Sequence, residues 1–298
     1  MHRASRSLAA VVVATVLAGP LACVGAPSAL APNHSGSLGV PHDGRITNAV
    51  PLPRDGDGYK VICYDGLHYG SPRLVGAIER AAANVARLRP GGTPLPVCDL
   101  SAPDGGRLAR HRSHQSGRDA DLLFYSLTTD GRPWQVQFTR FGSDGLSEVS
   151  PGNFVRLDVE REWLLVRSLV TDPEASVQWM FVAHPIEALL IEYARARGED
   201  PAVVWRAENV MMEPWDSLPH DDHVHLRLAC TPDEAVAGCL GGGPYWSWLP
   251  QLPQIEPMDD AALIEAIAGD LLPAPSHPLA PPRAVSARLD GHAPAPFP

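Results

Sequence analysis

The sequence has almost no lysine. Lys60 is the only lysine among 298 residues, and acidic residues outnumber Lys and Arg by 34 to 24, which gives a formal net charge of -10. No cluster of basic residues interrupts this acidic background. Proteins that bind nucleic acid rely on clustered Lys and Arg to neutralise phosphates. We therefore expect no nucleic-acid partner.

The N-terminal apolar run is too short to cross a bilayer, which takes about 20 apolar residues. Residues 8–18 are apolar and follow a short basic start with Arg3 and Arg6, a pattern typical of an export signal. We assign residues 1–26 to a signal peptide and expect a periplasmic protein. Cleavage after Ala26 or Ala31 stays open, as does lipoprotein-type processing, which would put a lipid anchor on Cys23 at the outer membrane or cell surface.

No two of the five cysteines have the C-x-x-C spacing of a cysteine zinc site. Without Cys23 four remain, and an even number of cysteines in an exported chain predicts disulfides. Four cysteines allow three pairings. Cys230 and Cys239 enclose a short segment, so we favour that bridge, which leaves Cys63 with Cys98.

The composition, 45% hydrophobic and 19% charged, is typical of a globular protein. Residues 27–45 are rich in Pro, Gly, Ser and His and predict a flexible leader before a domain at 46–250. Residues 251–298 form a Pro-rich C-terminal tail in which 260–272 has the pattern of an amphipathic helix. We expect Trp246 and Trp248 to pack on the domain, with carbohydrate stacking as the alternative.

Periodicity and capping signals predict helices and strands in mixed order, and hence an α+β domain with a small antiparallel sheet flanked by helices. The predicted helices are 72–88, 158–169 and 185–198, the predicted strands are 95–100, 120–127, 134–141 and 177–182, and the predicted irregular segments are 142–157 and 208–219.

A strand near the end of the domain carries two histidines. His223 and His225 are two residues apart and are followed by alternating Leu226, Arg227 and Leu228. Residues i and i+2 of a strand share a face, so both imidazoles face away from the core. One could bind a metal while its neighbour transfers protons.

Residues 113–121 supply the ligands that this strand lacks. His114 and Asp121 are seven residues apart, which on one helix is about 10 Å and on one strand means opposite faces. They converge only if the chain turns between them, and Gly117 suits such a turn. Together with one strand histidine they would make three ligands with a fourth position open, the layout of a catalytic zinc site.

The two segments together resemble the penicillin-insensitive murein endopeptidases, within the lysostaphin, D-alanyl-D-alanine peptidase and hedgehog-like metallopeptidase group. Residues 113–121, the first motif, read Ser-His-Gln-x-Gly-x-Asp-x-Asp, and residues 220–225, the second motif, read His-x-x-His-x-His. The resemblance extends from about residue 44 to residue 239. Its flanking matches are 69–75, 105–107, 181–182, 206–215 and 227–230.

The resemblance implies that His114, Asp121 and His225 bind Zn²⁺. It implies that His223 is the base or the donor to the tetrahedral intermediate, and that His220 has a supporting catalytic role. Asp119 shares a strand face with Asp121 and competes with it as a ligand; the family pattern favours Asp121 and leaves Asp119 to orient a ligand histidine.

Other histidines and acidic residues are given less weight. His68 and His184 match no motif and are interpreted as structural. Arg118 stands where the family pattern leads us to expect an apolar residue, and Asp221 and Asp222 make the second motif more acidic than expected.

The implied substrate is peptidoglycan, cut at the D-alanyl–meso-diaminopimelyl amide of cross-linked peptide stems. Penicillin would not inhibit such an enzyme, because no serine is acylated. The alternatives are a zinc D,D- or L,D-carboxypeptidase acting on uncrosslinked stems and a non-catalytic cell-wall-binding module. A structural zinc site usually closes with a fourth protein ligand, which argues against the binding module.

Overall fold

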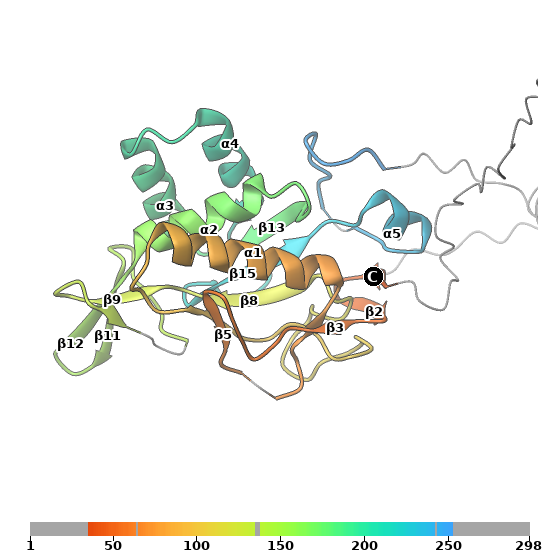
Figure 1. The fold of residues 1–298 in the computed structure, drawn as a ribbon, viewed down its shortest axis with the longest axis horizontal. Coiled ribbons are helices and arrows are strands. Elements are labelled where there is room, and N and C mark those ends of the chain that lie inside the picture. Colours follow the sequence, from red (N-terminus) through yellow and green to blue (C-terminus); the bar gives the residue numbers. More distant parts are fainter. Residues whose placement is uncertain (1–34, 64, 135–137, 242, 253–298) are drawn as a thin grey trace, which may run out of the picture. The chain divides into compact units, whose positions relative to one another are not determined.

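The computed structural model describes residues 35–63, 65–134, 138–241 and 243–252 (Figure 1). All of them belong to one compact unit that ends at Pro253. The helices are α1 (Pro72–Leu88), α2 (Val159–Thr171), α3 (His184–Ala196), α4 (Pro201–Val210) and α5 (Pro232–Val236). The strands are β1 (Gly36–Val40), β2 (Asp43–Thr47), β3 (Val50–Pro51), β4 (Asp55–Gly56), β5 (Tyr59–Val61), β6 (Tyr69–Gly70), β7 (Leu95–Val97), β8 (Asp119–Leu123), β9 (Ser126–Thr128), β10 (Pro133–Trp134), β11 (Leu146–Ser150), β12 (Asn153–Leu157), β13 (Val177–Phe181), β14 (Met211–Met212) and β15 (His223–Leu228).

A seven-stranded sheet in the order β14-β13-β15-β8-β7-β5-β4 forms the centre of the domain. Its middle strands, β13, β15, β8 and β7, pair antiparallel, while β13 with β14 and β5 with β7 pair parallel. Figure 1 shows α1 to α4 together on one side of these strands. The predicted α+β class is confirmed. The sheet is larger than predicted and mixed rather than purely antiparallel.

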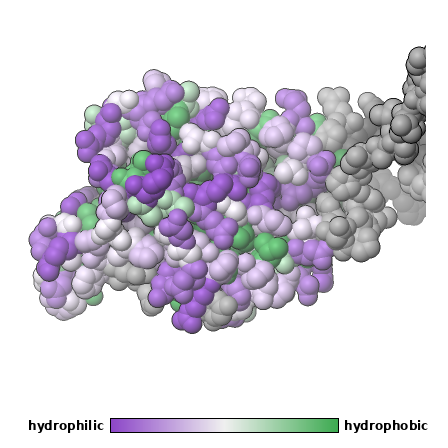
Figure 2. Space-filling view, in the orientation of Figure 1, coloured by the Kyte–Doolittle hydropathy of each residue, from purple (hydrophilic) through white to green (hydrophobic). Residues whose placement is uncertain are grey.

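Helix α1 forms where the capping signals place it. The Ser71 hydroxyl accepts a hydrogen bond from the backbone N–H of Leu74 (3.2 Å), and Pro72 occupies the first turn, where its missing N–H costs nothing. The apolar stripe of the helix, which includes Ile78 and Val85, is buried in the core. The helix ends at Leu88, before Pro90. Figure 2 shows a largely hydrophilic outer face around this core, with small hydrophobic spots.

The predicted leader is wrong for residues 36–45. Strands β1 and β2 form a hairpin whose register runs from Gly36 opposite Thr47 to Val40 opposite Asp43. The hairpin is ordered because it packs against the first motif, residues 113–121. The buried Ser37 hydroxyl donates to the backbone oxygen of Ser116 (2.5 Å), and Ile46 is 3% exposed. The folded part therefore begins before Ile46.

Other predicted boundaries also change. Residues 142–157 are not a loop, because β11 and β12 pair there and β12 continues onto β9. The predicted strand 120–127 is two strands, β8 and β9, which belong to different sheets. Of the predicted strand 134–141, only Trp134 lies in a strand, β10; residues 135–137 are outside the described residues. Helix α4 was not predicted, although Asp200 caps it through the backbone N–H of Ala202 and Pro201 begins it.

Both predicted disulfides, Cys63–Cys98 and Cys230–Cys239, are present. Trp246 and Trp248 pack against the core, as expected. No helix within the described ranges is long and apolar enough to span a membrane. The predicted signal peptide with Cys23 lies outside the described residues, as do residues 253–298 of the predicted tail, which include the helix predicted at 260–272.

Candidate metal site

The second motif lies on β15 at the middle of the sheet. Val224 and Leu226 are 1% and 0% exposed and face the core, as the alternation predicted. On the other face, the antiparallel register pairs His225 with Asp121 of β8 and His223 with Leu123. Residues directly opposite on neighbouring strands have side chains within about 5.5 Å of each other. The register of β8 on β15 therefore places the Asp121 carboxylate beside the His225 ring.

His114 reaches the same point from the loop before β8. The loop reverses at two left-handed positions, His114 with a φ of 65° and Gly117 with a φ of 69°. A side chain at Gly117 is excluded, because an added Cβ would lie 2.2 Å from the Cδ1 of Ile46. The His114 Nδ1 lies 2.8 Å from the backbone oxygen of Leu100, so its Nε2 points inward. The predicted turn at Gly117 is confirmed.

Three side chains meet at one carboxylate oxygen. The Oδ1 of Asp121 lies 3.3 Å from the His114 Nε2, 3.2 Å from the His225 Nδ1 and 3.5 Å from the His223 Nε2. His114 is fully buried, Asp121 is 2% exposed and His225 is 5% exposed. The structure thus brings together the three residues that the sequence marked as ligands.

The residues fit a bound cation. The Nε2 of His114 and the Oδ1 of Asp121 are buried and have no hydrogen-bond partner. Leaving such atoms unsatisfied is costly, and a metal ion at their meeting point removes the cost. Burial raises the pKa of Asp121, but the neighbouring His114 and His223 outweigh it and hold that pKa well below its ordinary value. Asp121 is therefore a carboxylate at neutral pH, as a metal ligand must be.

Asp119 lies behind His225. Its Oδ1 is 2.8 Å from the His225 Nε2 and accepts a hydrogen bond from the Arg227 Nε at 2.6 Å. When the His225 Nε2 carries the proton and donates it to Asp119, the Nδ1 presents a lone pair toward Asp121. Burial opposes ionisation of Asp119, but Arg227 and His225 outweigh it and lower its pKa. This position suits a residue that orients His225.

His223 and His220 border the centre. The His223 Nδ1 lies 2.5 Å from the Asp222 carboxylate, which leaves its Nε2 facing Asp121. Burial lowers the pKa of His223, but Asp121 and Asp222 outweigh it and raise that pKa above the ordinary value. The His220 ring is 4.8 Å from the His223 ring, and its buried Nδ1 has no hydrogen-bond partner. Burial, with the nearby His223 and His225, lowers the pKa of His220 to about 3.

His111 was missed by the sequence reasoning. Its Nε2 is 2.7 Å from the Asp99 Oδ2, and its Nδ1 is 3.9 Å from the Asp121 Oδ2. With His114 and Asp121 it forms one of the groups whose donor atoms lie close enough to hold a metal ion; His220, His223 and His225 form another. The His-x-x-His spacing of 111 and 114, which repeats that of 220 and 223, was the available signal.

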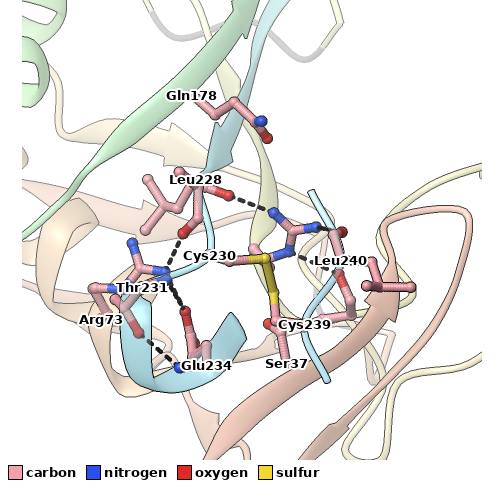
Figure 3. Close-up of a disulfide and its surroundings, with 12 residues drawn as sticks. Ser37, Arg73, Gln178, Leu228, Cys230, Thr231, Glu234, Cys239 and Leu240 are labelled. Carbon is pink, nitrogen blue, oxygen red and sulfur yellow. Dashed lines mark hydrogen bonds and ion pairs between the residues drawn. A yellow bond between two sulfur atoms is a disulfide. The ribbon is translucent and has the colours of Figure 1, made fainter. Parts of the chain in front are cut away.

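Arg118, the unexpected residue of the first motif, is fully buried. Its guanidinium donates to the backbone oxygens of Leu228 and Leu240, both at 2.9 Å, and burial lowers its pKa to about 10. Leu228 ends β15, and Leu240 directly follows Cys239, so Arg118 and the Cys230–Cys239 disulfide together tie the chain after β15 to the first motif. Figure 3 shows Leu228 and Leu240 on either side of this disulfide.

Arg73 of α1 strengthens the same region. Its guanidinium donates to the backbone oxygens of Ala175 and Ala229 and to the Glu234 carboxylate (2.8 Å). Glu234 also accepts from the backbone N–H of Thr231 in the capping box of α5 (Figure 3). These contacts hold the end of β15, the strand that carries His223 and His225, against α1.

The other histidines and acidic residues lie where they do little for the centre. His184 is exposed at the start of α3 and pairs with Glu187. His68 is buried beside Tyr69, with ring centroids 4.5 Å apart. Asp221 lies 3.5 Å from Arg140 at the rim.

Residues 37–240, about two thirds of the chain, match the family model described as penicillin-insensitive murein endopeptidase. No curated protein matches the chain.

Proposed function

Because the chain belongs to the penicillin-insensitive murein endopeptidase family, we propose that it is a zinc-dependent D,D-endopeptidase that cleaves the D-alanyl–meso-diaminopimelyl cross-link of murein. Zinc dependence is supported by two buried atoms that have no hydrogen-bond partner, the His114 Nε2 and the Asp121 Oδ1. Both lie beside the His225 Nδ1.

His114, Asp121 and His225 would hold the ion, since two imidazoles and one carboxylate suit Zn²⁺. His111 can add a nitrogen on the side of His114. Bound zinc supplies Lewis acidity, which polarises the scissile amide and lowers the pKa of water to about 7. Asp119 keeps the His225 ring in the orientation and tautomer that this binding needs.

His223 is the proton-transfer group in this proposal. Asp222 holds its Nδ1, so the Nε2 faces the reacting centre and can take a proton from the attacking water and return it to the leaving amine. Once it has taken that proton, His223 can also donate a hydrogen bond to the tetrahedral oxyanion. His220, held neutral by burial, packs against His223 and restricts its ring.

The proposed substrate supports a location outside the cytoplasm. Murein lies in the periplasm, which agrees with the export signal expected at residues 1–26 and with two disulfides. The lipid anchor on Cys23 stays a proposal from sequence alone. Penicillin would not inhibit the enzyme, because no acyl-serine forms.

The test is digestion of purified cross-linked peptidoglycan, with the products identified by mass spectrometry. We expect dimeric muropeptides to fall to monomers, and we expect chelator, His225→Ala and His223→Ala each to block this. His184→Ala is the matched control, because the His184 side chain is exposed and pairs with Glu187. Loss of terminal D-Ala from monomers would replace the endopeptidase by a carboxypeptidase. If zinc-loaded protein cleaved nothing, the remaining hypothesis would be the non-catalytic cell-wall-binding module.

A further inference from the structure

A cavity of about 400 Å³ lies at the opposite end of β13 from the metal site. Val177 at the start of β13 lines it, whereas Phe181 at the other end is the register partner of His225. Four residues of strand separate these ends by about 13 Å. The volume lies within the range of about 300–1,000 Å³ that is typical of ligand sites.

Arg206 of α4 lines this cavity without a partner. The residue is half-buried, and its guanidinium makes no hydrogen bond or ion pair with any described residue. The described arginines that are likewise not exposed all have partners: Arg73, Arg118, Arg161, Arg167 and Arg227. Asp172, the acidic residue of the cavity wall, is bound by Arg80 at 2.8 Å. The charge of Arg206 is therefore uncompensated, and an anionic ligand would pair with it.

Another part of the cavity wall is apolar. Trp248 lines the cavity and stacks on Trp246, with ring planes 2° apart and centroids at 5.1 Å. Trp246 is fixed because its Nε1 donates to the backbone oxygen of Gln178 (2.8 Å). Trp205 packs edge-on against Trp248 at 4.9 Å. An indole held in this way offers apolar surface at low entropic cost. Trp246 and Trp248 lie beyond residue 240, where the family match ends.

We propose that this cavity binds a carboxylate-bearing stem peptide of peptidoglycan, with the carboxylate on Arg206 and the aliphatic part of the stem against Trp248. The inference rests on the proposed function. This cavity is lined by the ends of α2 and α4 and lies at the far end of β13 from the metal site. A stem bound in it is therefore not the stem being cut, so the cavity would hold a neighbouring, uncut stem and keep the polymer on the enzyme.

The test is isothermal titration of the zinc-loaded full chain with soluble, uncross-linked peptidoglycan strands. These contain no cross-link to cut. We expect Arg206→Gln and Trp248→Ala each to weaken binding about tenfold or more, and Arg206→Lys to recover part of the loss because it restores the charge. Arg156→Gln is the matched control, since Arg156 is exposed and its guanidinium has no hydrogen-bond or ion-pair partner among the described residues.

Equal affinity of wild type and Arg206→Gln would overturn the proposal. So would an equal loss in Arg156→Gln, because it would mean that any surface charge has the same effect. Unfolding temperatures of the variants distinguish a lost contact from a lost fold, and recovery by Arg206→Lys excludes misfolding as the cause. Digestion of a soluble cross-linked dimer by wild type is read separately: failure there would refute the endopeptidase, whereas failure of the titration would refute only stem binding in this cavity.

Discussion

Replacing Asp119 by Asn tests whether the proposed metal site depends on Asp119, which lies behind His225. The change keeps the shape of the side chain and one acceptor oxygen but removes the charge that faces the His225 Nε2 at 2.8 Å and the Arg227 Nε at 2.6 Å. Loss of a partner that orients a ligand histidine costs about 10- to 100-fold in metal affinity. That range corresponds to about 1.4–2.8 kcal/mol.

The same substitution leaves the Arg227 guanidinium, whose side chain is 14% exposed, without its carboxylate. Breaking one partner of a buried pair costs about 3–5 kcal/mol, and Asn keeps one acceptor, so we expect the free energy of unfolding to fall by about 2–4 kcal/mol. Zinc affinity is measured by competition with a chromophoric chelator, and stability by urea denaturation. Asp57→Asn, at an exposed acidic residue, is the control. Zinc affinity within twofold of wild type would refute the role of Asp119.

Three further predictions concern other residues. His223→Ala should lower kcat by about 10²- to 10⁴-fold while the zinc content, measured by atomic emission, stays at the wild-type value; full activity would exclude His223 from proton transfer. Burial raises the pKa of Glu162 from 4.5 to about 8, so its contribution to stability is fully present below pH 4.5 and is lost as the pH rises to 8. Relative to Glu162→Gln, wild type should therefore lose up to about 5 kcal/mol between pH 4.5 and 8.5 in denaturant titrations, and a constant difference would contradict this. Arg118→Met leaves the buried Leu228 carbonyl and the Leu240 carbonyl without these donors and should lower the free energy of unfolding by about 2–4 kcal/mol; an unchanged urea midpoint would show that these bonds add nothing.

Local patterns predicted the elements whose signals are local. Ser71 and Pro72 predicted the start of α1, and the alternation after His223 predicted β15, because capping and side-chain alternation depend on neighbours within a few residues. The Cys230–Cys239 pairing was predictable because the two residues are close in sequence.

Signals that depend on distant partners were misinterpreted. Residues 36–45 are rich in Pro, Gly and His and suggested a leader, but Ser37 and Ile46 find burial sites against the first motif, far along the chain. Residues 142–157 looked like a loop because β11 and β12 are mostly exposed, so they lack the apolar alternation that marks a half-buried strand.

The sequence by itself determined which residue types are available for metal chemistry: His114 and Asp121 around a glycine turn, and His225 on a strand. Only the tertiary structure decided their arrangement. The register of β8 on β15 places Asp121 opposite His225 and Asp119 opposite Arg227, and a shift by one residue would turn these side chains to the other face. Register is set by packing across the whole sheet, so the sequence left Asp119 and Asp121 as rivals and gave His111 no role.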